Sequence, residues 1–457
     1  MTHGLVYGPT FAEMEDPTRI PASVQRELAG PRGKDPLDPI HLFRMHWKPE
    51  GRVRHLLLDP KLTGVDANVI VLAADHFPTG SHKVGAVYSI LIEKQTAGEV
   101  VPGRHTLVCP STGNYGIGGA WVGPRMNYRS LVVLPEEMSA ERFQKIGGYG
   151  AQVIKTPGSE SNVKEIYDKV KELRAVPENR ILEQFSEFGN YRFHWRVTGG
   201  ACLEVVRDLA ARGIGDGRVA AVVSAMGSSG TIACGDRVKS VHAGAAIVGV
   251  EPVECPTLFN VGFGSHRIEG IGDKHVTWIH NVLNMDLLVL VHDVDCLRGL
   301  QLLQEGTAIL AEALGADPER LGTLVGHLGI SGVCNVLGAI KAARHLGLGK
   351  GDNVVTFATD GFDRYPSVLA RLDRERGRMT RDEALRRIEI FHHAGSGPAL
   401  DGSRSVRERW HNQKYFTWVE QQGKTVRELQ AQKDPGFWAA EAARADEVDA
   451  RILSTRP

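Results

Sequence analysis

The chain has 457 residues, of which 42% are hydrophobic and 52 are glycine. This composition excludes a disordered chain, and the length predicts two or three ordinary domains or one large two-lobed protein. Lysine plus arginine equals aspartate plus glutamate, at 54 each, so the chain has no overall positive field to attract nucleic acid or an anionic membrane.

Cysteine usage and the first residues point to the cytoplasm. The six cysteines form no CxxC pair, which argues against a zinc site or a disulfide framework and predicts reduced thiols and no metal. The first residues carry no basic-then-apolar signal pattern, and no apolar run reaches membrane-spanning length. We therefore expect a cytoplasmic protein with no nucleic-acid or membrane partner.

The order of elements along the chain predicts an α/β fold. A stretch rich in proline and charge, to about Pro49, predicts an irregular arm. Helical patterns such as 162–175 and 198–212 separate most of the apolar strand-like runs that follow, which are "ANVIVLA", "HTLVCP", "SLVVLP", "AQVIKT", "VAAVVSA", "AAIVGVEP", "LLVLV" and "NVVTFAT". Strands that are apolar throughout and alternate with helices predict mainly parallel sheets covered on both faces, here divided between two lobes.

The chain divides into four predicted regions. Residues 1–49 form the arm, residues 50–87 and 191–370 the larger lobe, and residues 88–190 a smaller, mobile lobe. Residues 371–457 are charged and favour helix, so we expect a helical extension that packs on a partner subunit or over the active site. The aromatic residues of this extension predict packing anchors rather than a ligand cage; they are Trp410, Phe416, Trp418 and Trp438.

Lys83 lies in "FPTGSHKVGAVYS", residues 77–89, at the expected start of a helix. Pro78 and Gly80 indicate a turn before it, and apolar residues follow. A lysine beside apolar residues loses its proton more readily and becomes a nucleophile. By itself this pattern is more often that of a solvated surface lysine.

Two further loops each follow a predicted strand and precede a predicted helix. In "AMGSSGTIACGD" the loop Gly227, Ser228, Ser229, Gly230 and Thr231 offers backbone N–H groups and hydroxyls to a phosphate. In "CPSTGNYGIGGAW" the side chains of Ser111, Thr112 and Asn114 form a candidate seat for a carboxylate. An ordinary strand-to-helix turn and a capped helix are the respective alternatives.

A lysine, a phosphate loop and a carboxylate seat in this order predict pyridoxal 5′-phosphate (PLP), held as a Schiff base on Lys83. The sequence here resembles the fold-type II PLP enzymes, which are similar to the tryptophan synthase β subunit, and among them the cysteine synthase and cystathionine β-synthase family. The matching stretches are "PTGSHK", "STGNYG", "LPEEMSAERFQKIGGYGAQVIKTPG", "QFSEFGNYRFHWRVTGG", "GSSGT", "IVGVEP", "HRIEGIG" and "GFDRYPS".

The resemblance implies a role for each matched residue. Lys83 would form the Schiff base and move the Cα proton, and Asn114 would contact the cofactor's 3-hydroxyl. The substrate carboxylate would be held by Ser111, Thr112 and Gln184, and the phosphate by residues 227–231. The residue facing the pyridine nitrogen is either Thr359 or Asp360. A neutral hydroxyl there limits the electron sink and favours elimination at Cβ, whereas an aspartate would widen the chemistry.

The implied activity is β-elimination or β-replacement through an aminoacrylate intermediate, by a homodimeric lyase or transferase acting on an L-amino acid such as O-acetylserine, cysteine or serine. Val84 and Gly85 stand where cysteine synthases have Asp-Arg, so the substrate stays open. The alternatives are a threonine synthase or dehydratase type of enzyme, a PLP-fold protein without turnover, and a phosphate-binding module without PLP.

Overall fold

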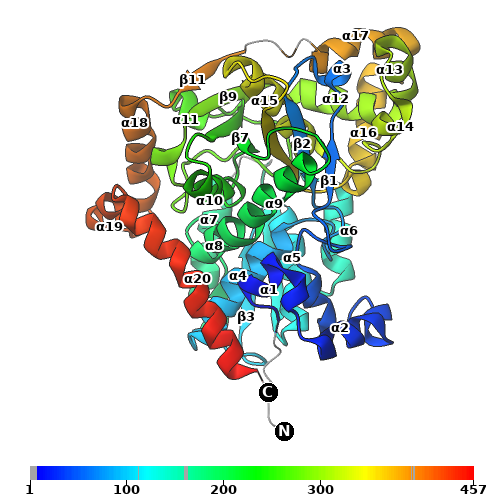
Figure 1. Cartoon of the computed structure of the whole chain (residues 1–457). Coiled ribbons are helices and arrows are strands. Elements are labelled where there is room, and N and C mark those ends of the chain that lie inside the picture. Colours follow the sequence, from blue (N-terminus) through cyan, green and yellow to red (C-terminus); the bar gives the residue numbers. More distant parts are fainter. Residues whose placement is uncertain (1–7, 112, 159–162, 393, 395–396, 457) are drawn as a thin grey trace.

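The computed structural model describes residues 8–111, 113–158, 163–392, 394 and 397–456. In this part of the chain the strands form one sheet of seven and one of four strands (Figure 1). The strands are β1 His55–Leu57, β2 Asn68–Ala73, β3 Thr106–Pro110, β4 Arg129–Pro135, β5 Gln152–Thr156, β6 Asn179–Ile181, β7 Val219–Ala225, β8 Ala246–Pro252, β9 Leu287–Val291, β10 Asn353–Ala358 and β11 Ala399–Asp401.

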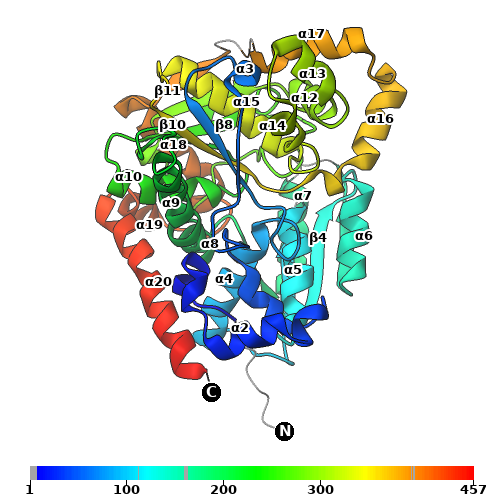
Figure 2. The same cartoon turned by 45° about the vertical axis from the view of Figure 1, so that its right-hand side comes forward.

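Helices lie on the faces of both sheets and along the sides of the molecule (Figure 2). The α-helices are α1 Phe11–Glu15, α2 Ala22–Ala29, α3 Pro60–Thr63, α4 Lys83–Thr96, α5 Asn114–Arg125, α6 Ala140–Gly148, α7 Val163–Arg174, α8 Phe188–Phe193, α9 Gly199–Ala210, α10 Cys234–Val241, α11 Thr257–Asn260, α12 Asp293–Glu305, α13 Thr307–Leu314, α14 Pro318–Gly322, α15 Ile330–His345, α16 Pro366–Arg376, α17 Arg381–His392, α18 Arg404–Lys414, α19 Val426–Ala431 and α20 Pro435–Thr455.

The seven-stranded sheet has the order β1-β2-β10-β7-β8-β9-β11. Its five inner strands are parallel, and the edge strands β1 and β11 are antiparallel to their neighbours. Successive residues of a strand point to opposite faces. Accordingly, Ile70 packs into one hydrophobic cluster with residues of α4 and α9, whereas Val69 and Val71 pack into another with residues of α12 and α15. Burial on both faces explains why the inner strands are apolar throughout.

The four-stranded sheet has the order β5-β4-β3-β6, and all its pairs are parallel. On one face Val132 packs with residues of α5 and α6, and on the other Val133 packs with residues of α7. The predicted α/β fold, with mainly parallel sheets covered by helices, is confirmed. The pattern did not predict the strands β1, β6 and β11, which have only three residues each.

The two ends of the chain meet on one side of the molecule. The predicted irregular arm is wrong in part, because it contains the helices α1 and α2. The long helix α20 runs along the molecule to reach α1 (Figure 1), where the Asp449 carboxylate accepts hydrogen bonds from the backbone N–H groups of Phe11 and Ala12. Among the described helices, none has the length and apolar character needed to cross a membrane.

The aromatic side chains of the extension are anchors with one exception. Trp410, Trp418 and Trp438 are buried, and each indole N–H donates to a backbone carbonyl. Phe416 is 58% exposed, so the prediction is wrong for this residue. Phe416 lies in the short π-helix Tyr415–Val419, in which Trp418 is the buried residue.

Candidate active site

Lys83 is the first residue of α4 and lines a cavity between loops of the two sheets. The turn before α4 is tied to the end of β10, because Ser81 Oγ donates to the carbonyl of Thr359 at 2.7 Å. Lys83 Nζ donates to Ser228 Oγ at 2.7 Å and to Gln184 Oε1 at 3.3 Å. The lysine amine therefore joins three loops that are far apart in the sequence.

The loops of the site all follow the carboxyl ends of parallel strands, where open α/β sheets bind ligands. The turn with Lys83 follows β2, and the loop with Ser111 and Asn114 follows β3. Gln184 follows β6, the loop 227–231 follows β7, and Thr359 follows β10. We call these segments the strand-end loops. Strand ends of one sheet share an edge, which groups the loops after β2, β7 and β10 in the larger sheet and those after β3 and β6 in the smaller one. Both groups line one cavity.

A narrow cavity, partly open to solvent, lies between the strand-end loops. It is lined by His82, Lys83, Ser111, Gly113, Asn114, Tyr115, Gln184, Phe185, Ala225, Gly227, Ser228, Ser229, Thr231, Gly270, Ile271, Asp273 and Thr359. The sequence-predicted residues Gly230 and Asp360 lie behind this lining. Thr112 lies outside the described residues, so its predicted contact with a substrate carboxylate stays a prediction.

The loop 227–231 has the properties of an anion site. The backbone N–H groups of Ser228 and Ser229 make no hydrogen bond within the described part of the chain, and both residues line the cavity. Ser229 adopts a left-handed backbone conformation, with φ of 57°. A Cβ added at Gly230 would lie 2.1 Å from Asn190 Oδ1, so only glycine fits there. Unpaired N–H groups in a tight loop before α10 suit a phosphate.

His82 contacts the loop 227–231 through Thr231, and its imidazole ring is neutral. Its Nε2 and Thr231 Oγ1 share a hydrogen bond of 3.0 Å, and its ring stacks on Trp47. Burial, together with the charge of Lys83, lowers the pKa of His82 to about 3. An uncharged imidazole leaves Lys83 as the charged group on this side of the cavity.

The loop after β3 is held by its own side chains. Ser111 Oγ accepts from the backbone N–H groups of Gly113 and Gly116, at 2.9 and 2.8 Å. Asn114 Nδ2 donates to Asp360 Oδ2 at 2.6 Å, and Asn114 Oδ1 accepts from Arg142 and Arg364. Asn114 thus borders the cavity while anchored to a buried polar cluster behind it.

Thr359 and Asp360 take different places. Thr359 lines the cavity, and its Oγ1 shares a hydrogen bond of 2.8 Å with Ser331 Oγ. Asp360 is fully buried, and its Oδ2 accepts from Asn114 and from the Tyr365 hydroxyl. Adjacent residues after a strand point in opposite directions, so only one of the two can face the cavity. In this structure it is the threonine.

The residues present fit PLP. The cavity holds a lysine amine, a phosphate loop with unpaired N–H donors, and a neutral hydroxyl on the strand end next to that of Lys83. A family model for pyridoxal-phosphate dependent enzymes matches residues 54–317, more than half of the chain. The chain belongs to this family. PLP is therefore its cofactor, as the sequence predicted.

Within the PLP family, the chain is similar to cysteine synthases. It is 30% identical over 310 residues to cysteine synthase 3 of Caenorhabditis elegans, which covers 66% of this chain and 82% of the relative. A Staphylococcus aureus cysteine synthase is 28% identical over 303 residues, with 66% and 88% covered. The predicted resemblance to the cysteine synthase and cystathionine β-synthase family is confirmed.

Solved structures show the same fold. A hydrogen sulfide-producing enzyme from Fusobacterium nucleatum has a TM-score of 0.59 at 23% identity, with 76% of this chain and 95% of that chain covered. A cysteine synthase from Entamoeba histolytica has a TM-score of 0.59 at 21% identity, with 74% and 92% covered. Each of these two structures therefore leaves about a quarter of this PLP enzyme uncovered.

Sequence reasoning missed three charged residues of the site. Arg142 on α6 and Arg364 are fully buried and donate to Asn114 Oδ1, which joins the two sheets behind the cavity. Asp273 lines the cavity itself, and burial raises the pKa of its carboxyl to about 7, although the positive charge of Lys83 opposes this shift. One signal could have found Asp273, since it directly follows the family-like stretch "HRIEGIG".

Proposed function

We propose that this PLP enzyme eliminates or replaces the group at Cβ of an L-amino acid of the O-acetylserine, cysteine or serine type. The family and its cysteine synthase relatives support chemistry at Cβ. The observation that carries the proposal is the position of Lys83, whose amine lies between the phosphate loop and Gln184 inside one cavity.

We assign a separate role in this reaction to each residue of the site. The bound cofactor supplies the aldehyde that captures the substrate amine and the ring that accepts electrons from Cα. Lys83 anchors the cofactor and, once displaced, its amine removes the proton from Cα and later returns one. Residues 227–231 bind the phosphate by backbone N–H groups and hydroxyls. Ser111, Thr112 and Gln184 hold the substrate carboxylate, and Asn114 contacts the cofactor's 3-hydroxyl.

Thr359 is the residue that we assign to the pyridine nitrogen. Its hydroxyl borders the cavity, whereas the Asp360 carboxylate is bound to Asn114 and Tyr365 behind it. A neutral partner leaves the ring nitrogen largely unprotonated, which limits electron delocalisation and favours loss of the Cβ group over other reactions of the Cα carbanion. This placement supports elimination and replacement at Cβ.

The test is a substrate panel on purified protein loaded with PLP. O-acetylserine, cysteine, serine, threonine and O-phosphohomoserine are offered alone and with sulfide. The products measured are sulfide, acetate, phosphate, ammonia, keto acid and the new amino acid. We expect turnover of at least one of the first three and a change in the visible spectrum on its addition. Turnover of threonine or O-phosphohomoserine only would instead support the threonine synthase or dehydratase alternative. A PLP-bound protein inert toward the whole panel would support the non-catalytic alternative.

Assembly, location and motion belong to the same proposal. We expect a homodimer in the cytoplasm, where its free cysteines, all six of them buried, stay reduced. We also expect the lobe of residues 88–190 to move toward the large lobe when substrate binds. Sedimentation and cell fractionation test the first two points. Scattering with and without substrate tests the third.

A further inference from the structure

Asp273 lines the cavity from a segment that follows no strand. Residues 270–280, which we call the wall segment, lie between α11 and β9 and contribute Gly270, Ile271 and Asp273 to the lining. A Cβ placed on Gly227 would lie 3.6 Å from Asp273 Oδ2, so the carboxyl lies against the start of the phosphate loop. It therefore borders the space that cofactor and substrate occupy.

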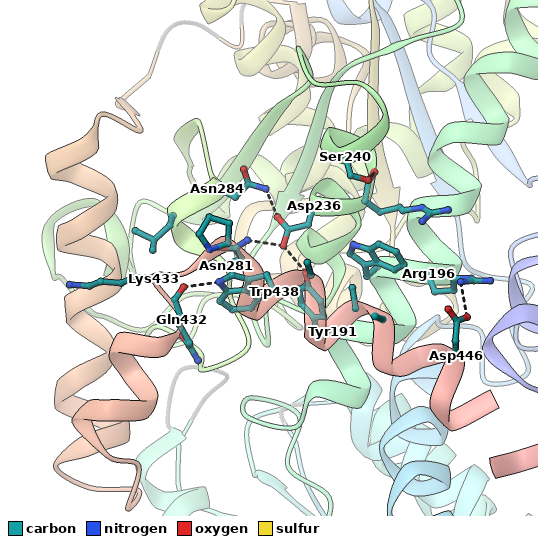
Figure 3. Close-up of a pocket in the computed structure, with 17 residues that line it drawn as sticks. Tyr191, Arg196, Asp236, Ser240, Asn281, Asn284, Gln432, Lys433, Trp438 and Asp446 are labelled. Carbon is teal, nitrogen blue, oxygen red and sulfur yellow. Dashed lines mark hydrogen bonds and ion pairs between the residues drawn. The ribbon is translucent and has the colours of Figure 1, made fainter. Parts of the chain in front are cut away.

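Asp273 differs from the other buried carboxyls whose pKa is raised. Glu251 accepts hydrogen bonds from the backbone N–H groups of Leu258 and Phe259. Asp236, in a separate cavity beside α20, accepts from Asn281, Asn284 and Tyr191 (Figure 3). The Asp273 side chain accepts a hydrogen bond from no donor in the described part of the chain. The residue is nevertheless buried, with only 8% of its surface exposed.

A buried carboxyl without a donor is costly for folding unless it is protonated or has a function. The backbone that carries this side chain is held in place. Gly272 N–H donates to the carbonyl of Met226 at 2.8 Å, and Thr257 Oγ1 donates to the carbonyl of Asp273 at 2.8 Å. The structure thus fixes the backbone of an unpaired carboxyl at the cavity, and a site on a fixed backbone suits a reacting group.

The far half of the wall segment is held by the C-terminal extension. Lys414 Nζ donates to the carbonyls of Trp278 and His280, and Trp418 Nε1 donates to the carbonyl of Val276. Trp278 N–H in turn donates to the carbonyl of Phe185, which follows Gln184. The extension therefore supports the wall that carries Asp273 from behind.

We propose that Asp273 is the acid–base residue for the groups that leave and enter at Cβ, an inference that rests on the proposed function. Lys83 takes the proton from Cα, the Cβ–X bond breaks with its electron pair on X, and the Asp273 carboxyl gives X its proton. The resulting carboxylate then takes the proton of the incoming nucleophile HNu as the Nu–Cβ bond forms, and Lys83 returns the proton to Cα. The sum is replacement of X by Nu with release of HX.

Several titratable groups face or adjoin Asp273. From α4 these are Lys83 and, beside it, the neutral His82; from α7 comes Tyr167, and from the segment before α11 comes Cys255. On the wall segment, burial lowers the pKa of His275 to about 4, and just before this segment burial also lowers the pKa of His266. Lys83 is thus the charged partner of Asp273 at neutral pH, and the two groups suit proton transfer at neighbouring carbons.

The first test uses Asp273→Asn, which keeps the size of the side chain and removes its ionisation. With cysteine or serine, whose leaving groups need a proton, kcat/KM should fall by about 100-fold, a usual effect for loss of a general acid or base. Elimination from β-chloroalanine should fall at least ten times less, because chloride leaves without a proton. The decline of the wild-type rate above the pKa of Asp273 should be missing in the variant. Equal losses on both kinds of substrate, or an unchanged pH profile, would overturn the proposal.

A second set of measurements separates chemistry from structure. Asp273→Ala should regain part of its activity on addition of formate, and no such rescue should occur in the matched variant Glu251→Gln, whose carboxyl lies outside the cavity. Infrared difference spectra of the substrate-free holoenzyme, wild type minus Asp273→Asn, should show a carboxylic acid band that disappears with rising pH. Absence of both rescue and band would reject the role of Asp273. If the wild type neither binds PLP nor turns over any substrate, the proposed function itself fails.

Discussion

The strand-end loops and the wall segment border the same cavity but are built in different ways. The strand-end loops owe their positions to the two parallel sheets, since each loop leaves the carboxyl end of a strand, β2, β7 and β10 in one sheet and β3 and β6 in the other. The wall segment is positioned by hydrogen bonds with Met226, Thr257 and the C-terminal extension. The comparison teaches that one half of this site is fixed by the strand ends, and the other half by hydrogen bonds with separate segments, among them an extension outside the residues 54–317 that the family model matches.

The largest effect tests the strand-end loops. Lys83→Met replaces the amine by a methyl-terminated chain of similar length, so neither Schiff base nor proton transfer at Cα is available. We expect turnover to fall by about 1,000-fold or more, with loss of the visible absorption of the holoenzyme. Lys350→Met, at an exposed position, is the matched control and should behave as the wild type. Activity retained by the Lys83 variant would refute the assignment.

The second largest expected effect concerns Asp273 on the wall segment and the dependence of the unfolding free energy on pH. Burial raises the pKa of Asp273 from its ordinary value of 3.8 to about 7 in the folded protein. The folded state thus keeps a proton that the unfolded chain loses, and the stability of the wild type falls as pH rises from about 4 to 7. Asp273→Asn lacks this dependence, so the variant should gain up to about 4 kcal/mol over the wild type by pH 7. Denaturant unfolding of the holoenzyme at several pH values measures it. Parallel stability curves would contradict the raised pKa.

The link between extension and wall segment is tested by Lys414→Met. Burial lowers the pKa of Lys414 well below its usual value. Its removal takes one of two donors from each of the carbonyls of Trp278 and His280, and takes the donor of the Gln432 side-chain oxygen. We expect a loss of roughly 1–3 kcal/mol in unfolding free energy. Amide exchange in residues 276–280 should become faster, and KM should rise more than kcat falls. The exposed Lys433→Met serves as control. Unchanged exchange in the wall segment would separate the extension from the site.

The smallest effect concerns the phosphate loop. The Cβ of Gly230→Ala would lie 2.1 Å from Asn190 Oδ1, so the loop must shift. Overpacking of this kind costs about 1–3 kcal/mol, which corresponds to a loss in PLP affinity of about 5- to 150-fold. Titration with PLP measures it. Gly147→Ala on α6, where an added Cβ meets nothing within 4 Å, should bind PLP as the wild type does. Equal affinity in both variants would mean that the loop does not hold the phosphate.

The sequence by itself determined the parts of this protein that depend on local pattern. Apolar runs alternating with helices predicted the parallel sheets, and the glycine- and serine-rich turns after them predicted the lysine, the phosphate loop and the cofactor. Such signals are local, because a buried strand must be apolar and a phosphate loop needs small residues. The three-residue strands gave no such signal and were missed.

Tertiary structure alone decided the rest. It chose Thr359 over Asp360 for the cavity, because a shift of one residue reverses the direction of a side chain. It also brought Asp273 to Lys83, and Lys414 to the wall segment, across long stretches of sequence. A single acid or lysine has no spacing that distinguishes it from a surface charge. Its burial and its partners exist only once the chain is folded.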